Sequence, residues 1–223
     1  MHINSGKFDQ AAPVVRNHVN AFEDANFDYA VAPSGSCVAS LSHQHGMIAQ
    51  HVGDRDLEDR AAQVASRTFE LAQFLTDIAK IDNAAEQLGS YFPHTVAYHP
   101  SCHGMRLLRL GDRQNRLLET VEGTTVVSPA HWDTCCGFGG TFSVKNPQVS
   151  SAMLGDKVDA LINTGADVCT GGDASCLMHI GGGLARTREL KPQDTHIPPT
   201  VHLARILAST KDRPLTLTGG SVR

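Results

Sequence analysis

The sequence predicts an α/β protein with two pseudo-repeated, Rossmann-like lobes and mostly parallel sheets, the first lobe being incomplete. Three observations predict this class. Short β-branched or aromatic runs ending in Pro, Gly or Ser alternate with longer segments of helical apolar spacing. This alternation is typical of parallel sheets covered by helices. A stretch near the N-terminus is echoed in the second half, and 223 residues with 41% hydrophobic composition can form two small lobes.

The individual elements follow from local patterns. Apolar residues at helical spacing predict helices over 8–26 and 55–80, and the second includes Phe69, Phe74 and Ile78. Strands are expected at 29–32, 95–98, 124–127 and 166–169. Further helices are expected at 103–110, 147–163, 175–186 and 200–209. The tail, 214–223, is polar, contains Gly219 and Gly220, and is expected to fray.

An internal sequence similarity predicts how the chain is divided into domains. DYAVAPSGSC at 28–37 aligns with DVCTGGDASC at 167–176, a constant offset of 139 residues (176 − 37). Ser5, Lys7 and Gln10 align with Ser143, Lys145 and Gln148 at offset 138. If the repeat is real, the counterpart of Cys135 and Cys136 would precede Met1, so we expect a missing N-terminal piece. The predicted domains are the remnant of a first repeat at 1–90, a complete second repeat at 91–210, and a flexible tail at 211–223.

Composition and charge exclude several classes. A formal net charge of −4 does not suit binding to a phosphate backbone, so no nucleic-acid partner is expected. There is no apolar run long enough to cross a bilayer, and MHINSGKFDQ does not resemble a secretory signal. We therefore expect a cytoplasmic protein without membrane insertion. In that reducing compartment, six cysteines indicate metal ligands, redox thiols or buried small hydrophobes rather than disulfides.

Four cysteines form the main constellation. Cys102 is followed after 32 residues by the adjacent Cys135 and Cys136, and after 39 more by Cys176. Each lies near the end of a predicted strand, and ligand sites in parallel sheets form at those ends. Adjacent cysteines form a disulfide only with strain, whereas paired thiolates are soft ligands for an iron–sulfur cluster. Glycines beside the pair would let backbone N–H groups approach a cluster: Gly137, Gly139 and Gly140.

Other interpretations of these residues stay open. Four thiolates could hold a structural zinc ion instead. Cys169 lies inside a strand-like run and is expected to be a packed small hydrophobe. His99 and His103 flank Cys102 and could ligate a metal or relay a proton, or could be polar residues at the site edge. Trp132 could shield a cluster or pack in the core. Asp173 is expected to cap a helix rather than act as a base.

A family resemblance adds to this picture. CCGFGGTFSVK at 135–145, with YHPSC before it and CLMHIGG after it, resembles the cysteine-rich CCG domain iron–sulfur oxidoreductases. This family includes lactate-utilization proteins, to which the resemblance is greatest, the iron–sulfur protein of glycolate oxidase and the CCG-containing protein of heterodisulfide reductase. It implies two CCG repeats and a cluster of the [4Fe–4S] type on Cys102, Cys135, Cys136 and Cys176, with Cys37 as a remnant ligand of the first repeat.

The resemblance also implies a function. The chain would be the iron–sulfur electron-transfer subunit of a complex that oxidises L-lactate to pyruvate. Its partners would be a ferredoxin-type iron–sulfur subunit and other lactate-utilization proteins. The alternatives are a thiol or heterodisulfide reductase, a glycolate oxidase iron–sulfur subunit, and a zinc-stabilised scaffold without a redox role. Acids or bases for the substrate chemistry are not evident, so no catalytic residue is assigned.

The sequence departs from the family pattern at one ligand position. The longer CCG pattern ends in Cys-x-x-Cys, but Asp173 stands at the first of these positions here, before Cys176. This change removes a fifth thiolate and argues against the paired cluster of heterodisulfide reductase. Cys169 could replace that thiolate only if its loop folds back.

Overall fold

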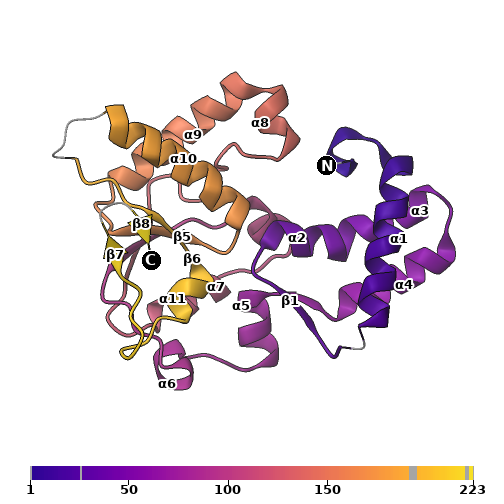
Figure 1. The fold of residues 1–223 in the computed structure, drawn as a ribbon, viewed down its shortest axis with the longest axis horizontal. Helices are drawn as coiled ribbons and strands as arrows, with labels where there is room; N and C mark the ends of the chain where they lie inside the picture. Colours follow the sequence, from indigo (N-terminus) through magenta and orange to yellow (C-terminus); the bar gives the residue numbers. More distant parts are fainter. Residues whose placement is uncertain (1, 26, 191–194, 219–220, 223) are drawn as a thin grey trace.

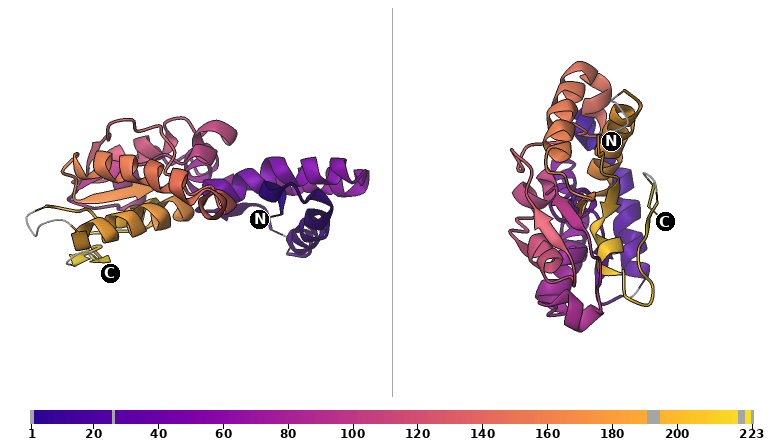
Figure 2. Two further views of the ribbon diagram at one scale, coloured as in Figure 1. Left: turned by 90° about the horizontal axis from the view of Figure 1, so that it is seen from above. Right: turned by 90° about the vertical axis from the view of Figure 1, so that its left-hand side faces the viewer.

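In the computed structural model, two lobes built on separate parallel sheets lie side by side (Figure 1). The structure describes residues 2–25, 27–190, 195–218 and 221–222. Figure 2 shows an elongated molecule, with the N-terminal helices at one end and the larger sheet at the other. Among the described residues, no helix has both the length and the apolar character that crossing a membrane requires.

The first lobe packs helices around a small sheet. Strands β1 (Ala30–Ala32) and β2 (Thr68–Glu70) pair in parallel. The lobe's apolar core joins α1, α3 and α4 through residues such as Val15, Ile48 and Leu57. Its helical elements are η1 (Ile3–Ser5), α1 (Phe8–Asp24), α2 (Gly35–Ala39), η2 (Ser40–Gln44), α3 (His45–His51), α4 (Arg55–Ser66), α5 (Leu71–Gln73) and η3 (Phe74–Ile78). Ala72 of α5 and Ala84 of the next helix, α6 (Ala84–Leu88), pack in the core of the second lobe.

The second lobe contains a four-stranded parallel sheet in the order β4-β3-β5-β6. Its strands are β3 (Thr95–Tyr98), β4 (Thr125–Val127), β5 (Val168–Gly171) and β6 (Thr200–His202). Alternate strand residues point to opposite faces. Val96 and Val168 pack with α7 and α11, while Ala97 and Cys169 pack with α9 and α10. The helical elements are η4 (His103–Leu107), α7 (Arg113–Glu119), α8 (Thr141–Lys145), α9 (Pro147–Ile162), α10 (Ala174–Leu190) and α11 (Leu203–Leu207).

The α/β class and its parallel sheets are confirmed, but two predicted helices are wrong in part. The helix expected over 55–80 is interrupted by β2, and the helix expected over 200–209 begins with β6. In both cases three residues pair with a neighbouring strand, β1 or β5, before the chain turns back into a helix. Local spacing does not reveal so short a strand, because its hydrogen-bond partners are distant in sequence.

The predicted tail contains a short antiparallel pair, β7 (Leu217–Thr218) with β8 (Ser221–Val222). Leu215 and Leu217 pack against the core cluster that contains Val96. Gly219, Gly220 and Arg223 lie outside the described residues. The flexibility of the tail stays a prediction.

The internal echo corresponds to repeated structure. Helix α10 spans Ala174–Leu190, and the offset of 139 maps it onto the continuous helical segment α2–η2–α3, Gly35–His51. In both lobes this segment follows a strand, β5 or β1. Ser34 and Asp173 occupy the same aligned position, and they pair with each other in an isolated antiparallel bridge. The two repeats therefore meet where their strand-to-helix turns face one another.

Candidate metal centre

The four predicted cysteines lie at the carboxyl ends of three adjacent strands. Cys102 precedes η4 in the segment that follows β3, and Cys176 lies in the first turn of α10 after β5. Cys135 and Cys136 lie in the loop between β4 and α8. Because parallel strands end at one sheet edge, these separate loops converge.

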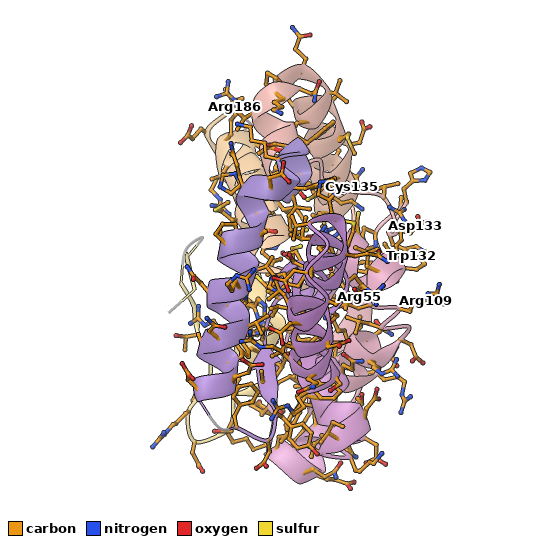
Figure 3. All side chains as sticks on the ribbon, turned by 90° about the vertical axis from the view of Figure 1, so that its right-hand side faces the viewer. Arg55, Arg109, Trp132, Asp133, Cys135 and Arg186 are labelled. Atoms are coloured by element: carbon orange, nitrogen blue, oxygen red, sulfur yellow. The ribbon has the colours of Figure 1, made fainter. Side chains whose placement is uncertain are left out.

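The convergence forms a cavity of about 280 Å³ lined by all four cysteines. The opposite wall comes from the first lobe and includes Ser36, Ser40 and Gln44. The N-terminal segment adds Ile3 and Asn4. Figure 3 labels Cys135, Trp132 and Asp133, which lie on the same side of the molecule in that view. The cavity therefore lies between the repeats, with the sulfur atoms on the second-lobe side.

The thiols interact with one another in a chain. Hydrogen bonds from Cys102 and Cys136 and from the Gly137 N–H, at 3.3 Å, lower the pKa of Cys135. The same contact with Cys135, together with burial, raises the pKa of Cys102. Contacts with Cys135 and Cys176, and burial, raise the pKa of Cys136. All six cysteines are free. Several thiolates can coexist here only with compensating positive charge, which a metal centre supplies.

Gly137 shapes the loop that carries the cysteine pair. Its φ is +87°, and a Cβ atom would lie 2.6 Å from the carbonyl oxygen of Ser150 on α9. Gly140 also has positive φ, at +59°, but its nearest neighbour for a Cβ is the Asn4 side chain at 3.6 Å. The close backbone approach at Gly137 is therefore to α9, while Gly139 and Gly140 line the cavity. The approach of their N–H groups to a cluster stays a prediction.

His99 stands out among the histidines near the cysteines. Its side chain is 1% exposed, and neither ring nitrogen has a hydrogen-bond partner among the residues that the structure describes. Burial, reinforced by Lys157, lowers its pKa to about 4. One of its nitrogens and the sulfurs of Cys136 and Cys176 all lie within 4.8 Å of one another. This group of donors could hold a metal ion.

Sequence reasoning missed Lys157, which is fully buried on α9. Its ammonium group donates to the carbonyl oxygens of His131, at 3.0 Å, and Trp132, at 3.3 Å. It therefore fixes the turn before the cysteine pair and interacts electrostatically with Cys136 and Cys102. The sequence pattern that could have predicted the burial of Lys157 is its helical spacing from Leu154 and Leu161, which places it on the buried face of α9.

The other residues singled out from the sequence differ in their position relative to the cavity. Cys37 is exposed on α2 and is not among the residues lining the cavity. Cys169 is buried inside β5, in the core with Ala97, as the packed-hydrophobe interpretation predicts. Trp132 is 50% exposed, so core packing is wrong for it. His103 does line the cavity.

Asp173 joins the two repeats. One carboxylate oxygen accepts the Ser36 N–H at 2.8 Å, from the start of α2, and the other accepts the Ser175 N–H at 3.1 Å. Burial alone would raise its pKa, but hydrogen bonds from Ser175 and Ser36 hold the pKa below its usual value. The expected helix-capping role is confirmed, and it extends to a helix of the other lobe.

Comparison with known proteins identifies the family. The profile of the cysteine-rich domain named CCG matches residues 1–42 and 96–181, more than half of the chain. The chain belongs to the CCG cysteine-rich domain family. The CCG protein is 39% identical to Lactate utilization protein A of Exiguobacterium sp., over 92% of this chain and 78% of the relative. It is 40% identical to the protein of the same name from Shouchella clausii, over 92% of this chain and 80% of that relative. It is 37% identical to the protein of that name from Oceanobacillus iheyensis, over 94% of this chain and 79% of that relative.

Proposed function

We propose that this CCG protein is an iron–sulfur electron-transfer protein of lactate utilization. In this proposal Cys102, Cys135, Cys136 and Cys176 hold the cluster, and the chain is a subunit of a complex that oxidises L-lactate to pyruvate. A ferredoxin-type iron–sulfur subunit and other lactate-utilization proteins would be its partners. The convergence of four free cysteines on one cavity carries the proposal, and the names of the relatives supply the metabolic context.

The donor set fits a cluster. Thiolate sulfur is the ligand that iron–sulfur clusters favour, and a bound cluster would cycle between oxidation states by one electron. The Gly137 N–H already points at the Cys135 sulfur, and such donors tune cluster potential. The Lys157 ammonium would offset the negative charge of several thiolates. Residues of the first lobe, among them Ser36 and Gln44, would restrict solvent access from the opposite wall.

Anaerobic purification followed by iron, acid-labile sulfide and zinc assays tests the cluster. We expect iron and sulfide in stoichiometric amounts and broad visible absorption that bleaches on reduction. Cys135→Ser and Cys136→Ser should lose both, while Cys37→Ser, at an exposed position outside the cavity lining, should keep them. Loss of the cluster in Cys37→Ser would instead support Cys37 as a ligand.

The metabolic part needs a separate test. In a strain that lacks this gene, the wild-type chain should restore growth on L-lactate and Cys135→Ser should not. Growth restored equally by both would contradict a cluster role in lactate oxidation.

A structural zinc site is the second candidate. The close grouping of one histidine nitrogen with the sulfurs of Cys136 and Cys176 favours it, because zinc readily accepts mixed nitrogen and sulfur ligands. Zinc without sulfide, in protein never exposed to air, would support this candidate and reject the cluster.

A further inference from the structure

The His99 side chain is held rigidly against the cysteine cluster. It directly follows β3, and its backbone N–H donates to the Thr170 carbonyl of β5 at 2.8 Å. Gly171 packs so closely on the His99 carbonyl that a Cβ there would lie 2.6 Å from the oxygen. Pro100 comes next and restricts the conformation of His99 further. The ring position is therefore set by the sheet rather than by a mobile loop.

A rigid, buried imidazole without partners is costly. Leaving a buried polar group unpaired costs about 1–3 kcal/mol. An apolar side chain of similar size would avoid that cost, so the ring needs a partner of another kind. The other nearby histidines differ: His103 is only half-buried, and the His179 ring lies 3.4 Å from the Ser150 hydroxyl.

Asp173 stands where the longer CCG pattern has a fifth cysteine, and its carboxylate already accepts hydrogen bonds. Both oxygens of Asp173 accept backbone N–H groups, from Ser36 and Ser175. Cys169, the other nearby thiol, is packed within the core. Among the described residues, His99 is the buried donor that remains unpaired within reach of Cys136 and Cys176.

We propose that His99 is a nitrogen ligand of the metal centre, bound beside Cys136 and Cys176. This inference rests on the proposed function, since it adds a fifth protein donor to the four cysteines of the cluster. A neutral imidazole, where the longer CCG pattern has a fifth thiolate, leaves the centre less negative, and histidine ligation raises the reduction potential of iron–sulfur centres. The position of His99 thus gives the protein a means of setting that potential.

Isotope labelling tests the ligand directly. Protein grown with ¹⁵N-histidine would be purified anaerobically, its iron and sulfide measured, and the reduced, paramagnetic cluster studied by pulsed EPR. We expect strong nitrogen hyperfine coupling that changes with the isotope. The coupling should disappear in His99→Gln and persist in His103→Gln, a matched variant of the other histidine beside Cys102.

A second variant, His99→Cys, keeps the inference testable if His99→Gln does not fold. His99→Cys supplies a thiolate at the same place, so it should retain iron and sulfide, lose the nitrogen coupling and titrate at a more negative potential. Iron and sulfide without histidine coupling in the wild type, or coupling that survives His99→Cys, would overturn the inference and leave the cluster proposal intact. Absence of iron and sulfide from the wild type would overturn both.

Discussion

The loop that presents the vicinal cysteines depends on one glycine. Gly137→Ala should destabilise the protein by about 2–4 kcal/mol, because alanine strains at positive φ and its Cβ overlaps the Ser150 carbonyl. Gly89→Ala, at the C-terminus of α6, is the control: its backbone is left-handed helical (φ +69°, ψ 23°), nothing lies within 4 Å of a Cβ there, and the change should cost about 1–2 kcal/mol. Urea unfolding followed by Trp132 fluorescence measures both. Equal losses would show that contact with α9 is unimportant.

The buried His45 should make stability depend on pH. Burial, and then the neighbouring His18, lowers the pKa of His45 from 6.5 to about 4. Below pH 6.5 the unfolded chain binds a proton that the folded chain excludes, so His45 lowers the free energy of unfolding as the pH falls towards 4. Allowing for residual solvent contact, we expect a loss of about 2 kcal/mol.

Variants isolate the contribution of His45. Unfolding by urea at several pH values should show a shallower pH dependence for His45→Gln than for wild type. His43→Gln, at an exposed position on η2, should follow the wild type. If His45→Gln keeps the full pH dependence, other groups cause it.

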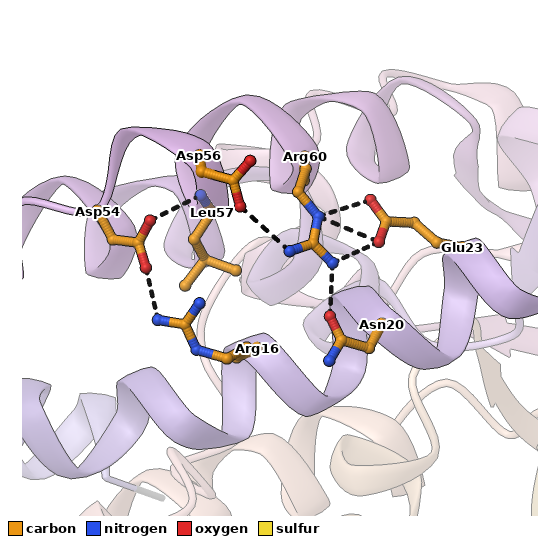
Figure 4. A network of polar contacts seen from close by, with 7 residues as sticks. All are labelled: Arg16, Asn20, Glu23, Asp54, Asp56, Leu57 and Arg60. Atoms are coloured by element: carbon orange, nitrogen blue, oxygen red, sulfur yellow. Dashed lines mark hydrogen bonds and ion pairs between the residues drawn. The ribbon is translucent and has the colours of Figure 1, made fainter.

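Between helices, α1 and α4 are joined by both a polar network and apolar contacts. Arg60 pairs with Glu23 and Asp56, while Arg16 pairs with Asp54, which also caps α4 through the Leu57 N–H (Figure 4). The Leu57 side chain is fully buried in the core of the first lobe. Burial of apolar surface contributes more than exposed ion pairs, which solvent and salt screen.

Substitutions should separate these two contributions. Leu57→Ala should destabilise the protein by about 2–5 kcal/mol, independently of salt. Arg60→Ala should have a smaller effect that decreases as salt is added, because its partners are accessible to solvent. Thermal unfolding by circular dichroism at low and high salt measures both. A larger effect of Arg60→Ala would mean that the network, rather than the core, holds these helices together.

Elements differ in how well the sequence predicts them. The cysteine site could be predicted, because strand-to-helix units end at one sheet edge whatever the details of packing. Strands β2 and β6 could not, since three residues become a strand only through a distant partner. The burial of Lys157 and the unpaired nitrogens of His99 likewise depend on contacts between segments far apart in the sequence. Local patterns therefore locate ligands better than they locate the residues that support them.

At the level of the whole molecule, the cavity depends on how the two repeats dock. Gly35 of α2 and Gly104 of η4 allow close approach: a Cβ at either position would lie 3.0 Å from the Ser101 hydroxyl. Nearby, His202 lies 2.9 Å from the Pro33 carbonyl, and Gln114 donates to the buried carboxylate of Glu70 at 3.0 Å. The first lobe is thus held over the cysteines by polar contacts along the junction of the repeats.

Asp173 is the contact that should matter most at this junction. Asp173→Ala would leave the N–H groups of Ser36 and Ser175 without their acceptor, at a cost of about 2–4 kcal/mol. The cavity wall should loosen as a result, so buried Cys136 in metal-free protein should react faster with iodoacetamide. Exposed Cys37 serves as the internal standard, and Asp156→Ala, at an exposed site on α9, serves as the control. Mass spectrometry of the labelled peptides gives both rates. An unchanged ratio of Cys136 to Cys37 labelling would mean that the other contacts of the junction keep the repeats docked without Asp173.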